Sequence, residues 1–136
     1  MAKYTTFIKS EDAKAQAEFY MQALGGEIQS MMTHGQLPDA SEELKDKVLH
    51  LCVLAGGVNF FMSDSVFEPL VKGNNVHLAL DFETEAEARQ AFENLAAGGH
   101  IAHPFEPAFW GSLFGEIEDK FGIKWMITAA PEVRQG

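Results

Sequence analysis

The feature that most constrains this chain is an internal repeat, because the same order of sequence signals occurs twice. Gly25-Gly26 and Gly98-Gly99 each follow a helical pattern. Further along each half, residues 57–61 align with residues 122–126. The offset that aligns the glycine pairs is a few residues larger than the offset that aligns 57–61 with 122–126. The first half therefore contains a few extra residues between these two signals. We therefore expect two copies of one structural unit and not a single continuous pattern.

The first half predicts one helix among four strands. Residues 4–9 alternate as a strand, and Ser10, Glu11 and Asp12 then supply a helix start. Apolar residues recur at helical spacing up to Leu24, where Gly25 provides a left-handed end. The remaining strands are expected at 27–34, 47–55 and 58–62, with Gly56-Gly57 as a tight hairpin turn and a loop with a short helical turn at 35–46.

The second half repeats this order. A strand at 76–82 leads to a helix at 84–97 with Thr84 as its cap and Phe92 and Leu95 on its inner face. Pro104 and Pro107 confine the strand at 101–108 to an edge or a bulge. The last strands are expected at 113–118 and 124–130, followed by a frayed tail at 131–136.

The predicted fold class is α+β: two βαβββ modules, at about 4–63 and 76–130, within one domain spanning 1–136. One helix per module covers one face of each curved mixed sheet, which leaves the other face free to bend round a cavity.

Composition excludes several classes of partner. The chain has 136 residues, of which 46% are apolar, and a formal net charge of −10. Such a surface repels nucleic-acid phosphates and anionic lipid, so we expect neither as a partner. No run approaches the length of a membrane span and no secretory leader is evident, so the expected location is the cytoplasm. Cys52, the only cysteine, lies in an apolar run and is expected to be a buried thiol and not a nucleophile.

Three motifs then resemble those of a known superfamily. They are Phe19-Tyr20 with Leu24-Gly25, His77-Leu78-Ala79-Leu80, and Asp119-Lys120-Phe121-Gly122. They are similar to the "FY…LG", "HxAL" and "DPDG" elements of the vicinal oxygen chelate (glyoxalase/bleomycin-resistance/dioxygenase) superfamily. This resemblance covers nearly the whole chain and implies the same βαβββ repeat.

Two further blocks resemble one branch of that superfamily. Residues 61–64, Phe-Met-Ser-Asp, are similar to its "MMSD" element, and residues 109–127 are similar to its C-terminal half. This is the PhnB-like branch, also known as the 3-demethylubiquinone-9 3-methyltransferase domain. A glycine-rich loop between a strand and a helix, typical of S-adenosylmethionine sites, is missing from the sequence pattern.

The superfamily resemblance also implies four metal positions, which fall by register at Thr5, Phe61, His77 and Met126. Zn²⁺, Ni²⁺ or Mn²⁺ requires several imidazole or carboxylate ligands, and only His77 supplies one. We therefore expect no cofactor, with a divalent metal as the lesser alternative. His34, His50, His100 and His103 are further histidines that match no metal position.

Several residues carry alternative interpretations. His77 is a residual ligand, a general base or a hydrogen-bonded core histidine. Aromatic residues near Gly111 and Gly115 line a pocket or belong to the core: Phe105, Phe109, Trp110 and Phe114. Asp64 and Asp119 are expected to cap turns more readily than to act as acids or bases. Glu116 and Glu118 are expected to share a solvent-facing side of a strand.

The leading functional prediction is a small-molecule-binding homodimer with a metal-poor cavity for an apolar or aromatic compound. The predicted pocket residues are Phe7, Phe61, His77, Phe109, Trp110 and Met126, with His77 as the catalytic candidate. The first alternative is a lyase or dioxygenase-type enzyme that uses a metal or His77 alone. The second is a structural or partner-binding homodimer whose pocket is filled by its own aromatic side chains.

Overall fold

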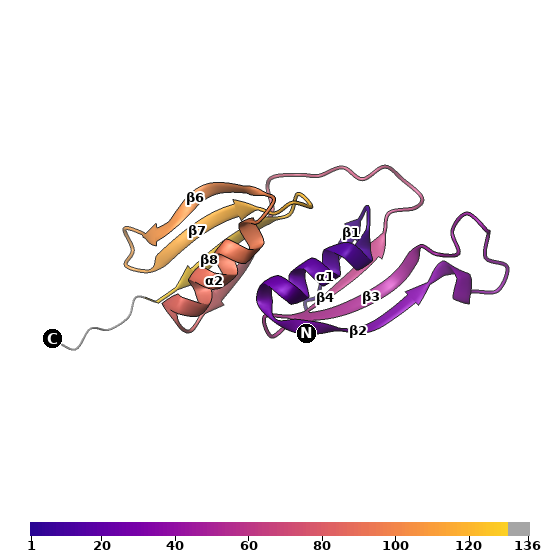
Figure 1. The fold of residues 1–136 in the computed structure, drawn as a ribbon, viewed down its shortest axis with the longest axis horizontal. Coiled ribbons are helices and arrows are strands. Elements are labelled where there is room, and N and C mark those ends of the chain that lie inside the picture. The colour runs from indigo at the N-terminus through magenta and orange to yellow at the C-terminus, as the bar shows by residue number, and fades with distance from the viewer. Residues whose placement is uncertain (131–136) are drawn as a thin grey trace. The chain divides into compact units, whose positions relative to one another are not determined.

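The computed structural model describes residues 1–130, which form two compact units. The first unit comprises Met1–Val71 and contains the first predicted module, and the second begins at Lys72 and contains the other (Figure 1). The predicted tail, 131–136, lies outside the described residues. No helix within residues 1–130 is long and apolar enough to cross a membrane.

The first unit is a four-stranded sheet with one helix. Its elements, in chain order, are β1 (Thr6–Ser10), α1 (Ala13–Leu24), β2 (Gly26–Thr33), the short 3₁₀ helix η1 (His34–Gln36), β3 (Val48–Ala55) and β4 (Val58–Asp64). The strand order is β1-β4-β3-β2, with β1 parallel to β4 and the other pairs antiparallel. Gly56 and Gly57, both with positive φ, form the predicted hairpin turn.

The second unit has the same topology. Its elements are β5 (Leu78–Phe82), α2 (Glu85–Ala96), β6 (His100–Pro107), β7 (Leu113–Glu118) and β8 (Lys124–Ala129). The strand order is β5-β8-β7-β6, again with the first pair parallel. The proline-containing strand β6 lies at the edge and its register shifts twice. The prediction of two βαβββ modules with mixed sheets is therefore confirmed.

Each helix begins at a side-chain cap and is followed, within two residues of its end, by a glycine with positive φ. Asp12 accepts a hydrogen bond from the Ala15 N–H (3.1 Å), and Thr84 accepts one from the Glu87 N–H (3.2 Å). Gly25 and Gly98 have φ of 79° and 77°, which a residue with a Cβ adopts at a cost. The side-chain caps fix where both helices begin, and the glycines fix where they end, close to the positions that the sequence predicts.

The second glycine of each pair has a different role. A Cβ at Gly26 would overlap the carbonyl group of Leu54, and a Cβ at Gly99 would overlap the carbonyl oxygen of Glu118. Both glycines therefore let the chain pass close to the backbone of the neighbouring strand. The Gly-Gly repeat combines a helix end with a close backbone approach in both units.

Each helix packs on one face of its own sheet, and the core of each unit lies between that helix and that sheet. Phe60 on β4 and Trp125 on β8 occupy equivalent places in the repeat, and both are buried. The polar atoms of the buried aromatic side chains Tyr20 and Trp125 have hydrogen-bond partners, as burial requires. The Tyr20 hydroxyl accepts a hydrogen bond from Gln16 Nε2 (2.8 Å), and Trp125 Nε1 donates one to Asp119 Oδ2 (2.8 Å).

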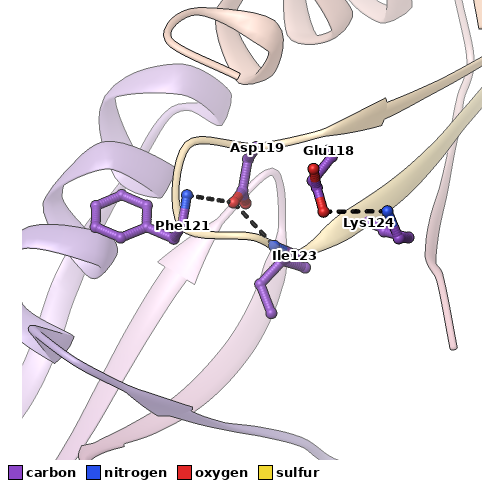
Figure 2. Close-up of polar contacts among 5 residues, drawn as sticks. All are labelled: Glu118, Asp119, Phe121, Ile123 and Lys124. Carbon is purple, nitrogen blue, oxygen red and sulfur yellow. Dashed lines mark hydrogen bonds and ion pairs between the residues drawn. The ribbon is translucent and has the colours of Figure 1, made fainter. Parts of the chain in front are cut away.

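Asp64 and Asp119 organise the backbone around them. Asp64 accepts hydrogen bonds of 2.7 Å from the N–H groups of Ala13 and Val48, which ties the start of α1 to the start of β3. Asp119 accepts hydrogen bonds from the N–H groups of Phe121 (2.8 Å) and Ile123 (3.1 Å), as Figure 2 shows. These contacts explain the structural role that the sequence favours for both carboxylates.

Two local predictions are corrected. His77 does not lie within the strand, because β5 begins one residue later at Leu78. Phe105 does not join the aromatic cluster at Gly111, because its ring packs against Phe92 on the helix side, with centroids 5.6 Å apart. Gly115 makes room for these two rings, since a Cβ there would lie 2.6 Å from Phe92.

Candidate functional site: the helix-free face of each sheet

The helix-free face of the first sheet carries aromatic side chains. Phe7 on β1, Phe61 on β4 and Cys52 on β3 lie side by side, because they are paired across the three strands. The ring of His50 lies 5.1 Å from that of Phe61 and 6.4 Å from that of Phe7. Phe7 is 51% exposed, so a bulky apolar ring faces outward from this sheet.

An open groove of about 330 Å³ adjoins this face. Its lining residues come from the start of β1 and the β3–β4 hairpin: Lys3, Tyr4, Thr5, Thr6, Gly57, Val58, Asn59 and Phe61. The groove contains two of the four metal positions that the resemblance implies, Thr5 and Phe61. Its volume is at the lower end of the range for small-molecule sites, roughly 300 to 1,000 Å³.

The Cys52 thiol belongs to the same face and is nearly covered, with 8% exposure. Its Sγ lies 3.6 Å from Gln29 Oε1 and 3.8 Å from Asn59 Oδ1. The thiol therefore donates weakly to amide oxygens and has no base beside it among these contacts. This environment agrees with the predicted buried thiol.

The helix-free face of the second sheet brings His77 to a carboxylate. Its Nδ1 atom lies 3.9 Å from Glu116 Oε1, and the two side chains are 30% and 29% exposed. Glu116 is paired with Met126 on β8, so all three side chains belong to one side of the sheet. Glu116 and Glu118 share the partly exposed side of β7, as predicted. Glu118, 41% exposed, forms an ion pair of 3.1 Å with Lys124 (Figure 2).

The hairpin between β6 and β7 carries the remaining predicted pocket residues. Phe109 and Trp110 occupy its tip and are 97% and 53% exposed. The Trp110 ring contacts Phe109 and Phe114, with centroids 4.9 and 5.4 Å apart. These three rings are not part of the helix-covered core, so the core interpretation holds only for Phe105.

The four superfamily metal positions do not supply a ligand set. Thr5, Phe61 and Met126 contribute a hydroxyl, an aromatic ring and a thioether, and only His77 carries a nitrogen ligand. Within residues 1–130, no group of three or more His, Cys, Asp or Glu side chains is arranged to hold a metal ion. The residues therefore do not fit the divalent ion that the superfamily implies.

Sequence reasoning missed two neighbours of the predicted residues. His50 was considered only as an unmatched ligand, yet strand alternation places it on the face of Cys52 and Phe61. Glu116 is predicted only to face solvent, whereas the same alternation also places it beside Met126. In both cases the period of two along the strand was the available signal.

Comparison with known proteins agrees with this fold. Over 125 residues the chain is 27% identical to protein YjdN of Escherichia coli strain K12, covering 84% of this chain and 85% of YjdN. The structure of PA1353 from Pseudomonas aeruginosa superposes with a TM-score of 0.84 and 27% identity, covering 97% of this chain and 100% of that one.

A second solved structure is similar as well. It is described as a putative 3-demethylubiquinone-9 3-methyltransferase, the PhnB protein from Bacillus cereus, and has a TM-score of 0.76 and 28% identity over 95% of this chain and 100% of that one. The model of the Glyoxalase/Bleomycin resistance protein/Dioxygenase superfamily matches residues 5–127. Because that match spans the elements of both βαβββ units up to the middle of β8, the chain belongs to the Glyoxalase/Bleomycin resistance protein/Dioxygenase superfamily and is similar to its PhnB-like members.

Proposed function

We propose that this protein binds a small apolar or aromatic molecule on the helix-free faces of its sheets, without a bound metal. The observation that carries the proposal is the outward-facing aromatic surface that remains on both units. Phe7 and Phe61 lie on the first, and Phe109, Trp110 and Phe114 on the second. Aromatic walls with few polar groups favour planar or apolar ligands.

The sites on the two units are each incomplete as enzyme active sites. The groove beside Phe61 offers hydroxyl and amide groups and one ammonium, from Lys3, but no acid–base pair. The second face offers His77 near Glu116 and the thioether of Met126.

The methyltransferase name of the similar Bacillus cereus protein gains no support from local structure. A typical S-adenosylmethionine site places glycines where a parallel strand leads into a helix. Here β1 leads into α1 through Glu11 and Asp12, and β5 leads into α2 through Glu83 and Thr84. Neither connection contains a glycine, so the proposal does not include methyl transfer.

A fluorescence titration with N-phenyl-1-naphthylamine, a neutral apolar aromatic probe, tests the proposal. The probe's emission should rise and saturate with the wild-type protein. Phe61→Ala and Trp110→Ala should each weaken binding at their own unit's face. Phe67→Ala is a matched control, because Phe67 is 82% exposed and lies outside both faces. Absence of saturable binding to the folded protein would overturn the proposal.

A second candidate function rests on the pair formed by His77 and Glu116. A carboxylate and an imidazole 3.9 Å apart on one face are groups of the kind that general acid–base catalysis uses. The protein would then be a metal-free lyase-type enzyme on a small metabolite. Turnover of a bound compound by wild-type protein, lost in both His77→Gln and Glu116→Gln, would favour this function over simple binding.

The proposal also includes a cytoplasmic homodimer. Twofold dimers are the commonest closed assemblies among soluble homo-oligomers, and each unit leaves one sheet face without a helix. Light scattering coupled to size exclusion should give twice the mass of one chain. A mass equal to one chain at micromolar concentration would remove the homodimer from the proposal without affecting ligand binding.

A further inference from the structure

The tip of the β6–β7 hairpin holds two aromatic residues in fixed positions. The Gly111 N–H donates to the Ala108 carbonyl oxygen (3.0 Å), which closes a turn with Phe109 and Trp110 at its centre. The Ala108 N–H donates to the Ser112 carbonyl oxygen (2.8 Å) and joins the two strands below the turn. Gly111 has φ of 97°, a conformation that glycine adopts without strain. The rings are therefore displayed by a defined turn.

Three rings meet at this tip and form what we call the aromatic corner: Phe109, Trp110 and Phe114. The planes of Phe109 and Trp110 are 87° apart, and those of Trp110 and Phe114 are 70° apart. Both contacts are edge-to-face, so neighbouring ring planes stand close to perpendicular, and Trp110 remains 53% exposed. Rings at right angles are the walls of the aromatic cages that hold quaternary ammonium groups.

Carboxylates flank the aromatic corner. Glu106 on β6 is the cross-strand partner of Phe114, and Glu116 follows Phe114 by two residues on the same side of β7. The Glu106 Oε1 atom lies 3.9 Å from His103 Nε2, as the Glu116 Oε1 atom does from His77 Nδ1.

The other charged groups on this side of the sheet add no excess of positive charge. Lys124 is bound to Glu118 at 3.1 Å, and Asp81 accepts a hydrogen bond from Thr128. The face around the rings is therefore acidic when both imidazoles are neutral. Acidic groups beside aromatic walls attract cations and repel anions.

We propose that the aromatic corner binds an organic cation, a quaternary or protonated amine with small apolar substituents, with Trp110 as its platform and Glu106 and Glu116 as its counter-charges. This inference rests on the proposed small-molecule function and names the chemical class that the second unit takes. The positive group faces the π surface of the indole, and the carboxylates supply longer-range attraction. A neutral molecule of the same shape keeps only the apolar contacts.

The test compares choline with 3,3-dimethylbutan-1-ol, which replaces the quaternary nitrogen by carbon and is otherwise matched in shape. The chain has two tryptophans, so its indole N–H groups give two signals in a proton–nitrogen NMR spectrum. Trp125 is buried and donates to Asp119, which makes its signal an internal control. Trp110→Phe assigns the other signal.

Choline should move the Trp110 signal in a saturable way and leave the Trp125 signal in place. The neutral alcohol should bind roughly fivefold to tenfold more weakly. Replacing both counter-charges, as Glu106→Gln/Glu116→Gln, should weaken choline binding severalfold. The control Glu83→Gln/Glu93→Gln removes the same charge from exposed positions outside the face and should change little.

Equal binding of choline and the alcohol, or no movement of the Trp110 signal, would overturn the inference. The naphthylamine titration separates this failure from that of the proposed function. Saturable naphthylamine binding without choline binding contradicts the cation site alone. Failure of both compounds to bind contradicts the cation site and the proposed function together.

Discussion

The indole N–H of Trp125 donates a hydrogen bond of 2.8 Å to the carboxylate of Asp119, six residues earlier in the chain. Trp125 is fully buried and Asp119 is 3% exposed. The same carboxylate accepts hydrogen bonds from the backbone N–H groups of Phe121 and Ile123 (Figure 2). One acidic side chain therefore fixes the last hairpin and satisfies the polar atom of the largest core residue.

Asp119→Ala should lower the free energy of unfolding by about 2 to 4 kcal/mol, because it leaves a buried indole N–H and two turn N–H groups without their acceptor. Urea denaturation measures the loss. Glu118→Gln, next in sequence but partly exposed in its ion pair with Lys124, should cost about 0.5 kcal/mol or less. Equal effects of the two substitutions would contradict the role given to Asp119.

The glycine pairs predict an asymmetric response to alanine. Gly26→Ala should destabilise by more than about 3 kcal/mol, because its Cβ would overlap the backbone of Leu54, which cannot move without distorting β3. Gly25→Ala meets no atom within 4 Å, so it costs only its backbone conformation, φ 79° with ψ 123°, roughly 1 to 3 kcal/mol. Denaturant midpoints of the two variants check this order, and the reverse order would refute it.

Much of this fold was predictable because its signals are local. Helix ends at Gly25 and Gly98, the Gly56-Gly57 turn and the edge position of β6 depend on backbone preferences that each residue carries with it. The side of the sheet to which the Phe105 side chain points was not predictable from its nearness to Gly111 in the sequence. It depends on Phe92, thirteen residues earlier, and on the space that Gly115 leaves for both rings.

The candidate site was predicted less completely. The superfamily resemblance marks Phe61 and Met126 as metal positions, and Phe7 is a predicted pocket residue. All three lie on the helix-free faces, where the period of two along a strand places them. The approach of Glu116 to His77 requires the cross-strand register, because β5 and β7 are separated by β8 in the sheet. The three-ring geometry at Trp110 likewise depends on the turn that Gly111 closes, which residue types alone do not specify.

Metal content separates the proposed metal-free protein from the metal-dependent enzyme that the sequence leaves as an alternative. Elemental analysis of protein purified without chelator or polyhistidine tag should find substoichiometric Mn, Fe, Ni and Zn, because only His77 of the four superfamily positions carries a ligand atom suited to them. His77→Ala should leave the metal content unchanged. Near-stoichiometric metal that disappears in that variant would indicate a metalloenzyme.

Ligand binding before and after chelation tests the central claim most directly. The protein is titrated with N-phenyl-1-naphthylamine, dialysed against EDTA and titrated again. Aromatic walls that bind without a metal should give the same saturable curve and the same affinity both times. Binding that is lost after dialysis and restored by Zn²⁺ or Mn²⁺, or a protein that binds no probe in either state, would contradict the account of a metal-poor small-molecule-binding protein.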